Sequence, residues 1–236
     1  GLYVRLKLTE APIFIAALNK PKPKTLPMME VIVTHFKPFF LGMLICIAGY
    51  VLFYIMIAFS QIYAKSAPTV SEAGYTMGLG FSPQIFTALL MCSAISLAIT
   101  IAISGKYIDI VGRRIWLIWT TFGVAIFGLA LPYFLDNGTT TSLFWFLMIG
   151  MGLIGMGYGP LASFLPELFP THARYSGASL TYNISGLFGA SVAAIIALPL
   201  NANYGLKGVG IYLTLNAVLS LIGLWFITET KDKHLA

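Results

Sequence analysis

Residues 39–63 read FFLGMLICIAGYVLFYIMIAFSQIY, a run without Asp, Glu, Lys, Arg or His. A helix needs about 20 mostly apolar residues to cross the roughly 30 Å hydrocarbon core of a bilayer, so this run is long enough to span it. Five more uncharged runs of similar length follow, at residues 83–105, 115–135, 142–166, 176–200 and 208–228. The sequence therefore predicts an all-α membrane protein in which residues 39–228 form a bundle of six transmembrane helices.

The composition supports this prediction. Only 9% of the residues are charged and 58% are hydrophobic, whereas a soluble domain carries about 25% charged residues. Inside a bilayer the backbone must satisfy its own hydrogen bonds, which leaves helices and closed barrels as the spanning structures. Barrel strands alternate apolar and polar residues over about 10 positions. The runs here are continuous and longer, so they favour helices.

The net charge of +6 suggests at first a nucleic-acid partner. Its placement favours another interpretation. If the chain begins in the cytoplasm, all of the 14 Lys and Arg residues except Lys65 and Lys207 fall on the cytoplasmic side. This is the bias that orients membrane proteins. We therefore expect a multi-pass protein of the bacterial inner membrane with both termini in the cytoplasm, the lipid bilayer as a partner, and no nucleic acid.

The segments outside the bundle are expected to be cytoplasmic. Residues 1–38 are interpreted as a linker that contains the end of a preceding helix and a basic, proline-rich segment with a short helix over residues 28–36. Residues 229–236 are interpreted as a tail. Because residues 1–8 (GLYVRLKL) look like the end of a helix that begins upstream, we expect this chain to be the C-terminal piece of a longer protein.

The connection between the second and third spans carries the most specific pattern. Residues 105–114 read GKYIDIVGRR. We expect Gly105 and Gly112 to permit a tight turn and Asp109 to accept N–H groups at the start of the next helix. Arg113 and Arg114 would anchor that helix at the cytoplasmic face. A hairpin shaped only by charge bias would explain the two arginines but not the spacing of the glycines and the aspartate.

This pattern resembles the loop signature of the major facilitator superfamily, which recurs after the second helix of each six-helix half. Residues 166–180, PELFPTHARYSGASL, are similar to the loop between helices 10 and 11 in the metabolite:proton symporter branch of that superfamily. Residues 1–6 and 229–232 match the same branch. The resemblance implies that the chain is the C-terminal half of such a transporter and that a missing N-terminal six-helix half is its partner. The second loop motif comprises Pro166, Glu167, Pro170, Arg174 and Gly177.

The resemblance also implies roles for the charged residues of both loops. Asp109, Arg113 and Arg114 would form a cytoplasmic gating contact with the opposite half. Glu167 and Arg174 flank a turn bounded by prolines, where they either pair with each other or are solvated separately.

Polar side chains within the predicted spans are the candidates for contact with a small-molecule substrate, because helices 7, 8, 10 and 11 of the fold that this chain resembles face a central cavity. Helix–helix hydrogen bonding by Asn183 and packing by the tyrosines remain the alternatives. The candidates are Tyr50, Tyr54, Gln84, Ser93, Tyr158, Ser163, Tyr182 and Asn183.

The resemblance implies proton-coupled uptake of a small organic metabolite, either an organic acid or a zwitterion, by alternating access. We expect no enzyme activity or catalytic residue, since His35, His172 and His234 all lie outside the spans. We also expect no cofactor and no metal, since Cys46 and Cys92 lack metal-ligand spacing.

No Asp, Glu, Lys, Arg or His lies within a span, so the group that carries the coupling proton is expected in the missing half. A group at the edge of a span, Glu167 or Asp109, is the weaker alternative. A fragment that does not transport, or a six-helix channel or small transporter that acts as a dimer, remains the alternative.

Overall fold

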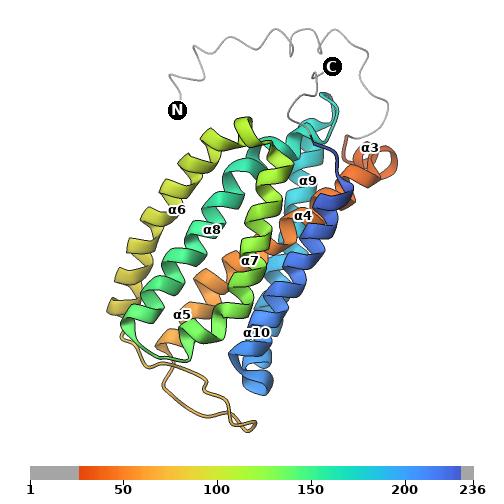
Figure 1. The fold of residues 1–236 in the computed structure, drawn as a ribbon. Helices are drawn as coiled ribbons and strands as arrows, with labels where there is room; N and C mark the ends of the chain where they lie inside the picture. The colour runs from red at the N-terminus through yellow and green to blue at the C-terminus, as the bar shows by residue number, and fades with distance from the viewer. Residues whose placement is uncertain (1–26, 230–236) are drawn as a thin grey trace, which may run out of the picture.

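The computed structural model describes residues 27–229, and the expectations for residues 1–26 and 230–236 fall outside that range. Residues 27–229 form a helical bundle in which the only β-type pairing is a bridge between Val70 and Thr76. Figure 1 shows the long helices side by side, with α3 at the end of the bundle where α6 passes into α7. The helices are α3 (Pro27–Thr34), α4 (Phe36–Tyr54), the π-helical turn η1 (Ile55–Phe59), α5 (Ser60–Lys65), α6 (Pro83–Val111), α7 (Arg113–Leu135), α8 (Thr140–Glu167), α9 (Arg174–Gly186), the π-helical turn η2 (Leu187–Ser191) and α10 (Val192–Phe226).

Five helical runs in this range are long and apolar enough to cross a membrane. The first four contain the predicted spans at residues 39–63, 83–105, 115–135 and 142–166. The fifth and sixth predicted spans lie together in one run, Arg174–Phe226, which comprises α9, η2 and α10. The all-helical membrane architecture is confirmed, and the division of this last run depends on its geometry at Gly205.

Gly205 interrupts the last run with a backbone that is not helical, at φ 65° and ψ −169°. A positive φ is a conformation that glycine adopts at no steric cost. The part of the run before Gly205 and the part after it pass α4 in opposite directions. Before Gly205, later residues of the run contact later residues of α4, whereas after Gly205 later residues of the run contact earlier residues of α4. The contacts that show this join Ser185 to Met43, Ala194 to Tyr54, Ser220 to Ala48 and Leu44, and Gly223 to Leu41.

A close helix contact joins α6 to α8. A side chain at Gly155 would collide with Thr100 and with a backbone carbonyl of α6, and one at Gly159 would collide with Ser104. Ser104 Oγ donates to the Gly155 carbonyl at 3.4 Å. Small residues at this spacing let two helix backbones approach closely in a membrane. The glycine-rich sequence of α8 therefore serves packing.

The outward faces of the bundle are strongly apolar. Along α6, side chains four positions apart are exposed, among them Met91 (70%) and Ile95 (60%). A contiguous exposed apolar face marks contact with a membrane or another protein. This face of α6 is therefore positioned for lipid or for another helical half.

Candidate functional site

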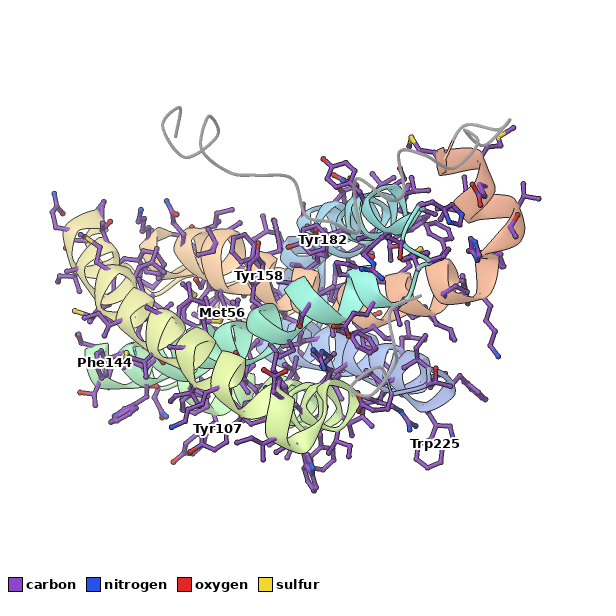
Figure 2. All side chains as sticks on the ribbon, turned by 90° about the horizontal axis from the view of Figure 1, so that it is seen from above. Met56, Tyr107, Phe144, Tyr158, Tyr182 and Trp225 are labelled. Carbon is purple, nitrogen blue, oxygen red and sulfur yellow. The ribbon has the colours of Figure 1, made fainter. Side chains whose placement is uncertain are left out.

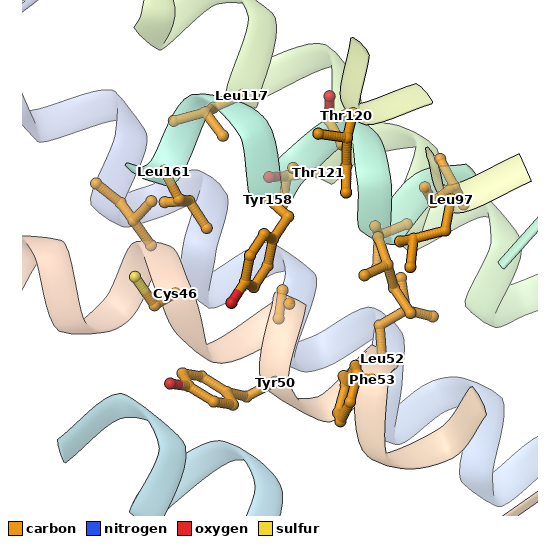
Figure 3. Close-up of a pocket in the computed structure, with 18 of the residues that line it drawn as sticks. Cys46, Tyr50, Leu52, Phe53, Leu97, Leu117, Thr120, Thr121, Tyr158 and Leu161 are labelled. Atoms are coloured by element: carbon orange, nitrogen blue, oxygen red, sulfur yellow. The ribbon is translucent and has the colours of Figure 1, made fainter. Parts of the chain in front are cut away.

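A cavity of about 260 Å³ lies between α4, α6, α7, α8 and α9. Its polar groups are the phenols of Tyr50, Tyr158 and Tyr182 and the hydroxyls of Thr120 and Thr121, whereas most of its wall is apolar. Figure 3 shows Tyr158 reaching into this space from α8 and Tyr50 lining it from α4. No Asp, Glu, Lys, Arg or His lies among the described residues of the wall. The cavity therefore offers neutral hydrogen-bonding groups and aromatic rings.

The tyrosines come from three different helices. The rings of Tyr50 and Tyr182 have centroids 4.9 Å apart and are tilted by 51°, a favourable arrangement for an aromatic pair. One and two turns after Tyr182, Gly186 and Gly189 leave room for the ring and the Cβ atom of Tyr50. Tyr158 is 53% exposed, so the bundle does not enclose it. Figure 2 shows Tyr158 and Tyr182 near each other on facing helices.

A second hollow of about 290 Å³ continues from the first between α8 and α9. The two hollows share Tyr158, Leu161 and Tyr182, and the second extends to Pro166 and Tyr175. Those two residues lie next to the connection between α8 and α9. The cavity therefore leads towards one end of the bundle, where Lys37, Lys106, Arg113, Arg114 and Arg174 lie; we call it the basic end.

The other five candidates from the sequence are not among the described residues that line either hollow. Gln84 is exposed in the first turn of α6. The remaining four bond to backbone carbonyls: Tyr54 to Ala194 at 3.4 Å, Ser93 to Leu90 at 2.7 Å, Ser163 to Pro160 at 3.1 Å and Asn183 to Ser179 at 2.8 Å.

Arg113 links three helices at the basic end. Its guanidinium lies 3.0 Å from Glu167 at the end of α8 and 3.4 Å from Asp109 in the last turn of α6. The side chains of Arg113 and Glu167 are only 15% and 17% exposed, whereas Asp109 is 69% exposed. The pair with Glu167 is therefore shielded from water, and Asp109 keeps an open side.

A reciprocal cap joins α7 to the end of α10. The two carboxylate oxygens of Glu229 accept the backbone N–H groups of Arg113 and Arg114, both at 3.1 Å. In return, Arg114 donates from Nε to the Leu224 carbonyl at 2.7 Å and from a terminal nitrogen to the Trp225 carbonyl at 3.0 Å. A helix start attracts negative charge and a helix end attracts positive charge, so both contacts are favourable.

Two expectations for the first motif were wrong. The expected turn at Gly105 does not form, because α6 continues to Val111 and the chain breaks only at Gly112, where φ is 103°. Asp109 does not cap the next helix, since Glu229 accepts the N–H groups there. Gly112 must lack a side chain, because a Cβ atom would lie 2.8 Å from the Glu229 carboxylate.

The second motif shapes the connection between α8 and α9. Pro166 lies in the last turn of α8, the Pro170 carbonyl accepts from Ala173 N, and Gly177 lies directly beneath the Phe169 ring. Glu167 forms an ion pair with Arg113, a partner that the sequence analysis did not consider. Arg174 begins α9, and its buried Nε has no hydrogen-bond partner among residues 27–229.

The sequence of the chain matches a known family model. The model described as "Sugar (and other) transporter" matches residues 74–236. The chain belongs to this family of the major facilitator superfamily. The family points to a transporter instead of an enzyme.

Curated relatives of this transporter-family chain match over its whole length. It is 90% identical to a Haemophilus influenzae protein named "Putative metabolite transport protein", of which it covers 53%. It is 37% identical to the Escherichia coli "Inner membrane metabolite transport protein YhjE" (52% covered) and 26% identical to the Dickeya dadantii "Glycine betaine/proline/ectoine/pipecolic acid transporter OusA" (46% covered). The chain thus spans about half the length of these relatives. No solved structure matches it.

Sequence reasoning missed several residues that the site uses. Glu229 was noted only as part of a terminal motif. It lies far from Arg113 and Arg114 along the chain, so the sequence did not indicate that it caps α7. Thr120 and Thr121 were not among the candidates from the sequence. Only the helix packing shows that they face the cavity.

Proposed function

We propose that this chain is the C-terminal, six-helix half of a secondary transporter of the bacterial inner membrane, which takes up a small organic metabolite together with protons. The reversal at Gly205 supports counting residues 176–200 and 208–228 as separate spans. The name of the Escherichia coli relative supports the inner membrane. The partner is a second six-helix half, consistent with relatives about twice the length of this chain.

The observation that carries the proposal is an uncharged, tyrosine-lined cavity that continues towards the basic end. In a transporter that alternates access, the site lies near the middle of the membrane, between two halves that rock about it. The partial exposure of Tyr158 leaves this cavity open for the second half to complete.

The chemistry of the wall fits an organic acid or a zwitterion. The phenols and the hydroxyl of Thr121 can donate hydrogen bonds to a carboxylate without placing a charge in the membrane, whereas the Thr120 hydroxyl donates to the Trp116 carbonyl. The faces of Tyr50, Tyr158 and Tyr182 attract a cationic or quaternary ammonium group. The name of the Dickeya dadantii relative, which includes glycine betaine and proline, supports the zwitterion.

Proton coupling is proposed from the family resemblance. Since no Asp, Glu, Lys, Arg or His lines the cavity among the described residues, the proton-carrying group is expected in the other half. At the basic end, proposed to be cytoplasmic, the open side of Asp109 is available to that half. Arg113, together with Asp109 and Glu167, would then form the contact that breaks and reforms as access alternates.

The test is uptake by the full-length transporter in proteoliposomes, with labelled glycine betaine, proline and a dicarboxylic acid offered separately. We expect uptake of at least one class that is driven by an inward proton gradient and abolished by a protonophore. Uptake at the same rate with and without the proton gradient would contradict proton coupling.

The chain Gly1–Ala236 reconstituted by itself tests the alternatives. We expect it to insert and to give no flux. Flux from the chain without a second half would favour a dimeric channel or small transporter.

A further inference from the structure

Three side chains that can bind metals meet at the basic end, away from the cavity. They are Glu30 in α3, His35 between α3 and α4, and His172 in the connection between α8 and α9. One potential ligand atom from each lies within 4.8 Å of the other two. His172 Nε2 already contacts Glu30 Oε1 at 2.7 Å. His172 is remote from the other two residues along the chain, so only the fold brings the three together.

Apolar packing holds the three elements together. Val31, one residue after Glu30, is fully buried against Phe169 and Ala173, which flank His172 in the connection. The helix α3 also continues into the turn at His35, whose backbone N–H donates to the Val31 carbonyl at 3.1 Å. The positions of the ligands are therefore set by the fold and do not depend on their own hydrogen bond.

The carboxylate of Glu30 is only partly used by the protein. Its Oε1 contacts His172, but its Oε2 is buried and has no hydrogen-bond partner among residues 27–229. A buried carboxylate oxygen without a partner is costly. A bound cation would compensate it, and His172, whose side chain is 53% exposed, leaves the cluster accessible from solvent.

We propose that Glu30, His35 and His172 form a binding site for a divalent transition metal ion, with Zn²⁺ as the best match. Zn²⁺ prefers imidazole nitrogen and carboxylate oxygen at about 2.0–2.2 Å and four ligands in a tetrahedron. Such a tetrahedron places its ligand atoms about 3.4 Å apart. The ligand atoms lie within 4.8 Å of one another, so binding would draw them closer together, and water would supply the fourth ligand.

Binding would replace the contact between His172 and Glu30 with three metal bonds. Metal binding requires the nitrogen lone pair of each imidazole, so the ion competes with protons for both rings. The ion would fasten α3 to the connection between α8 and α9. This inference does not depend on the substrate or on proton coupling.

The test is a Zn²⁺ titration of the purified full-length protein in detergent, without a histidine tag, in competition with a chromogenic chelator. We expect one ion per chain in the wild type. His35→Gln, His172→Gln and Glu30→Gln should each weaken Zn²⁺ binding at least about 10-fold. Even mutation of residues that only hydrogen-bond to metal ligands lowers metal affinity about 10–100-fold. X-ray absorption at the zinc edge should show two imidazoles in the wild type.

His234→Gln and Glu72→Gln are the matched controls, because they remove one histidine and one carboxylate elsewhere in the sequence. Both should bind Zn²⁺ as the wild type does. The thermal midpoint without metal checks that each variant is folded, and added Zn²⁺ should raise it only where the site is intact. Wild-type binding no tighter than that of His172→Gln, or a zinc spectrum without imidazole, would overturn the proposal.

Discussion

The basic end and the tyrosine-lined cavity use opposite chemistry within one bundle. At the basic end, Arg113, Arg114, Glu167 and Glu229 join the ends of α7, α8 and α10 through charged contacts of 2.7–3.1 Å. The cavity has no such charge and relies on hydroxyls and aromatic rings. Charges cost little near water and much at membrane depth. We infer that the basic end holds helices in place, whereas the cavity recognises a ligand.

The largest effect is expected from Arg113→Ala. It removes the guanidinium that pairs with Glu167, whose side chain is largely shielded from water. Breaking a buried ion pair costs about 3–5 kcal/mol, and the partial exposure here reduces the expected loss to about 2–3 kcal/mol. Unfolding by SDS in mixed micelles would measure it. Arg113→Lys should recover part of the loss, and equal stability of Arg113→Ala and wild type would show that the network does not hold the helices.

Glu229→Ala is expected to have the next largest effect on stability. It removes the acceptor for the backbone N–H groups of Arg113 and Arg114. Loss of an N-terminal cap costs about 1–2 kcal/mol. Glu229→Gln should lose less because its amide oxygen still accepts one bond. The same unfolding assay applies, with the exposed Glu72→Gln as the control, and a loss for Glu72→Gln as large as for Glu229→Ala would contradict the cap.

For the cavity, Tyr182→Phe should change binding and spare stability. The change removes one hydroxyl and keeps the ring that pairs with Tyr50. Losing one hydrogen bond to the substrate costs about 1 kcal/mol, or roughly fivefold in affinity, while the unfolding free energy should stay within about 0.5 kcal/mol. The substrate concentration dependence of uptake by the full-length protein measures the loss of affinity. Tyr133→Phe, at a residue 76% exposed outside the cavity, should change neither.

The smallest effect is expected at the end of the bundle opposite to the basic end. Burial raises the pKa of Asp136 above 3.8, and nearby Lys207 partly offsets this by lowering it. The folded state therefore binds this proton more tightly than the unfolded state, so the contribution to stability is full below pH 3.8 and is lost as the pH rises through the folded pKa. Asp136→Asn should remove this dependence.

The burial of Asp136 is only partial, and by solvent accessibility the residue is exposed. The stability that Asp136→Asn gains over the wild type at neutral pH should therefore stay within about 0.5 kcal/mol. Thermal midpoints of wild type and Asp136→Asn between pH 3.5 and 7 would measure it. Lys207→Gln should strengthen the pH dependence of the wild type. A wild type that becomes more stable than Asp136→Asn as the pH rises would contradict the sign.

Hydropathy alone located the helical segments, because each bilayer-spanning helix must be apolar over its own length. Four predicted spans lie within helical runs of their own. The loop motifs were also recognised from residues adjacent in sequence, and they led to the correct family. These features are local, so one stretch of sequence is sufficient to predict them.

Only the tertiary structure decided which residues meet. The sequence did not show that Glu229, and not Asp109, caps α7, that Glu167 pairs with Arg113, or that the chain reverses direction at Gly205. Of eight polar candidates within the predicted spans, packing brought Tyr50, Tyr158 and Tyr182 to the cavity. A helix whose surface is apolar all round does not reveal which face points inward, because lipid and protein interior select the same side chains.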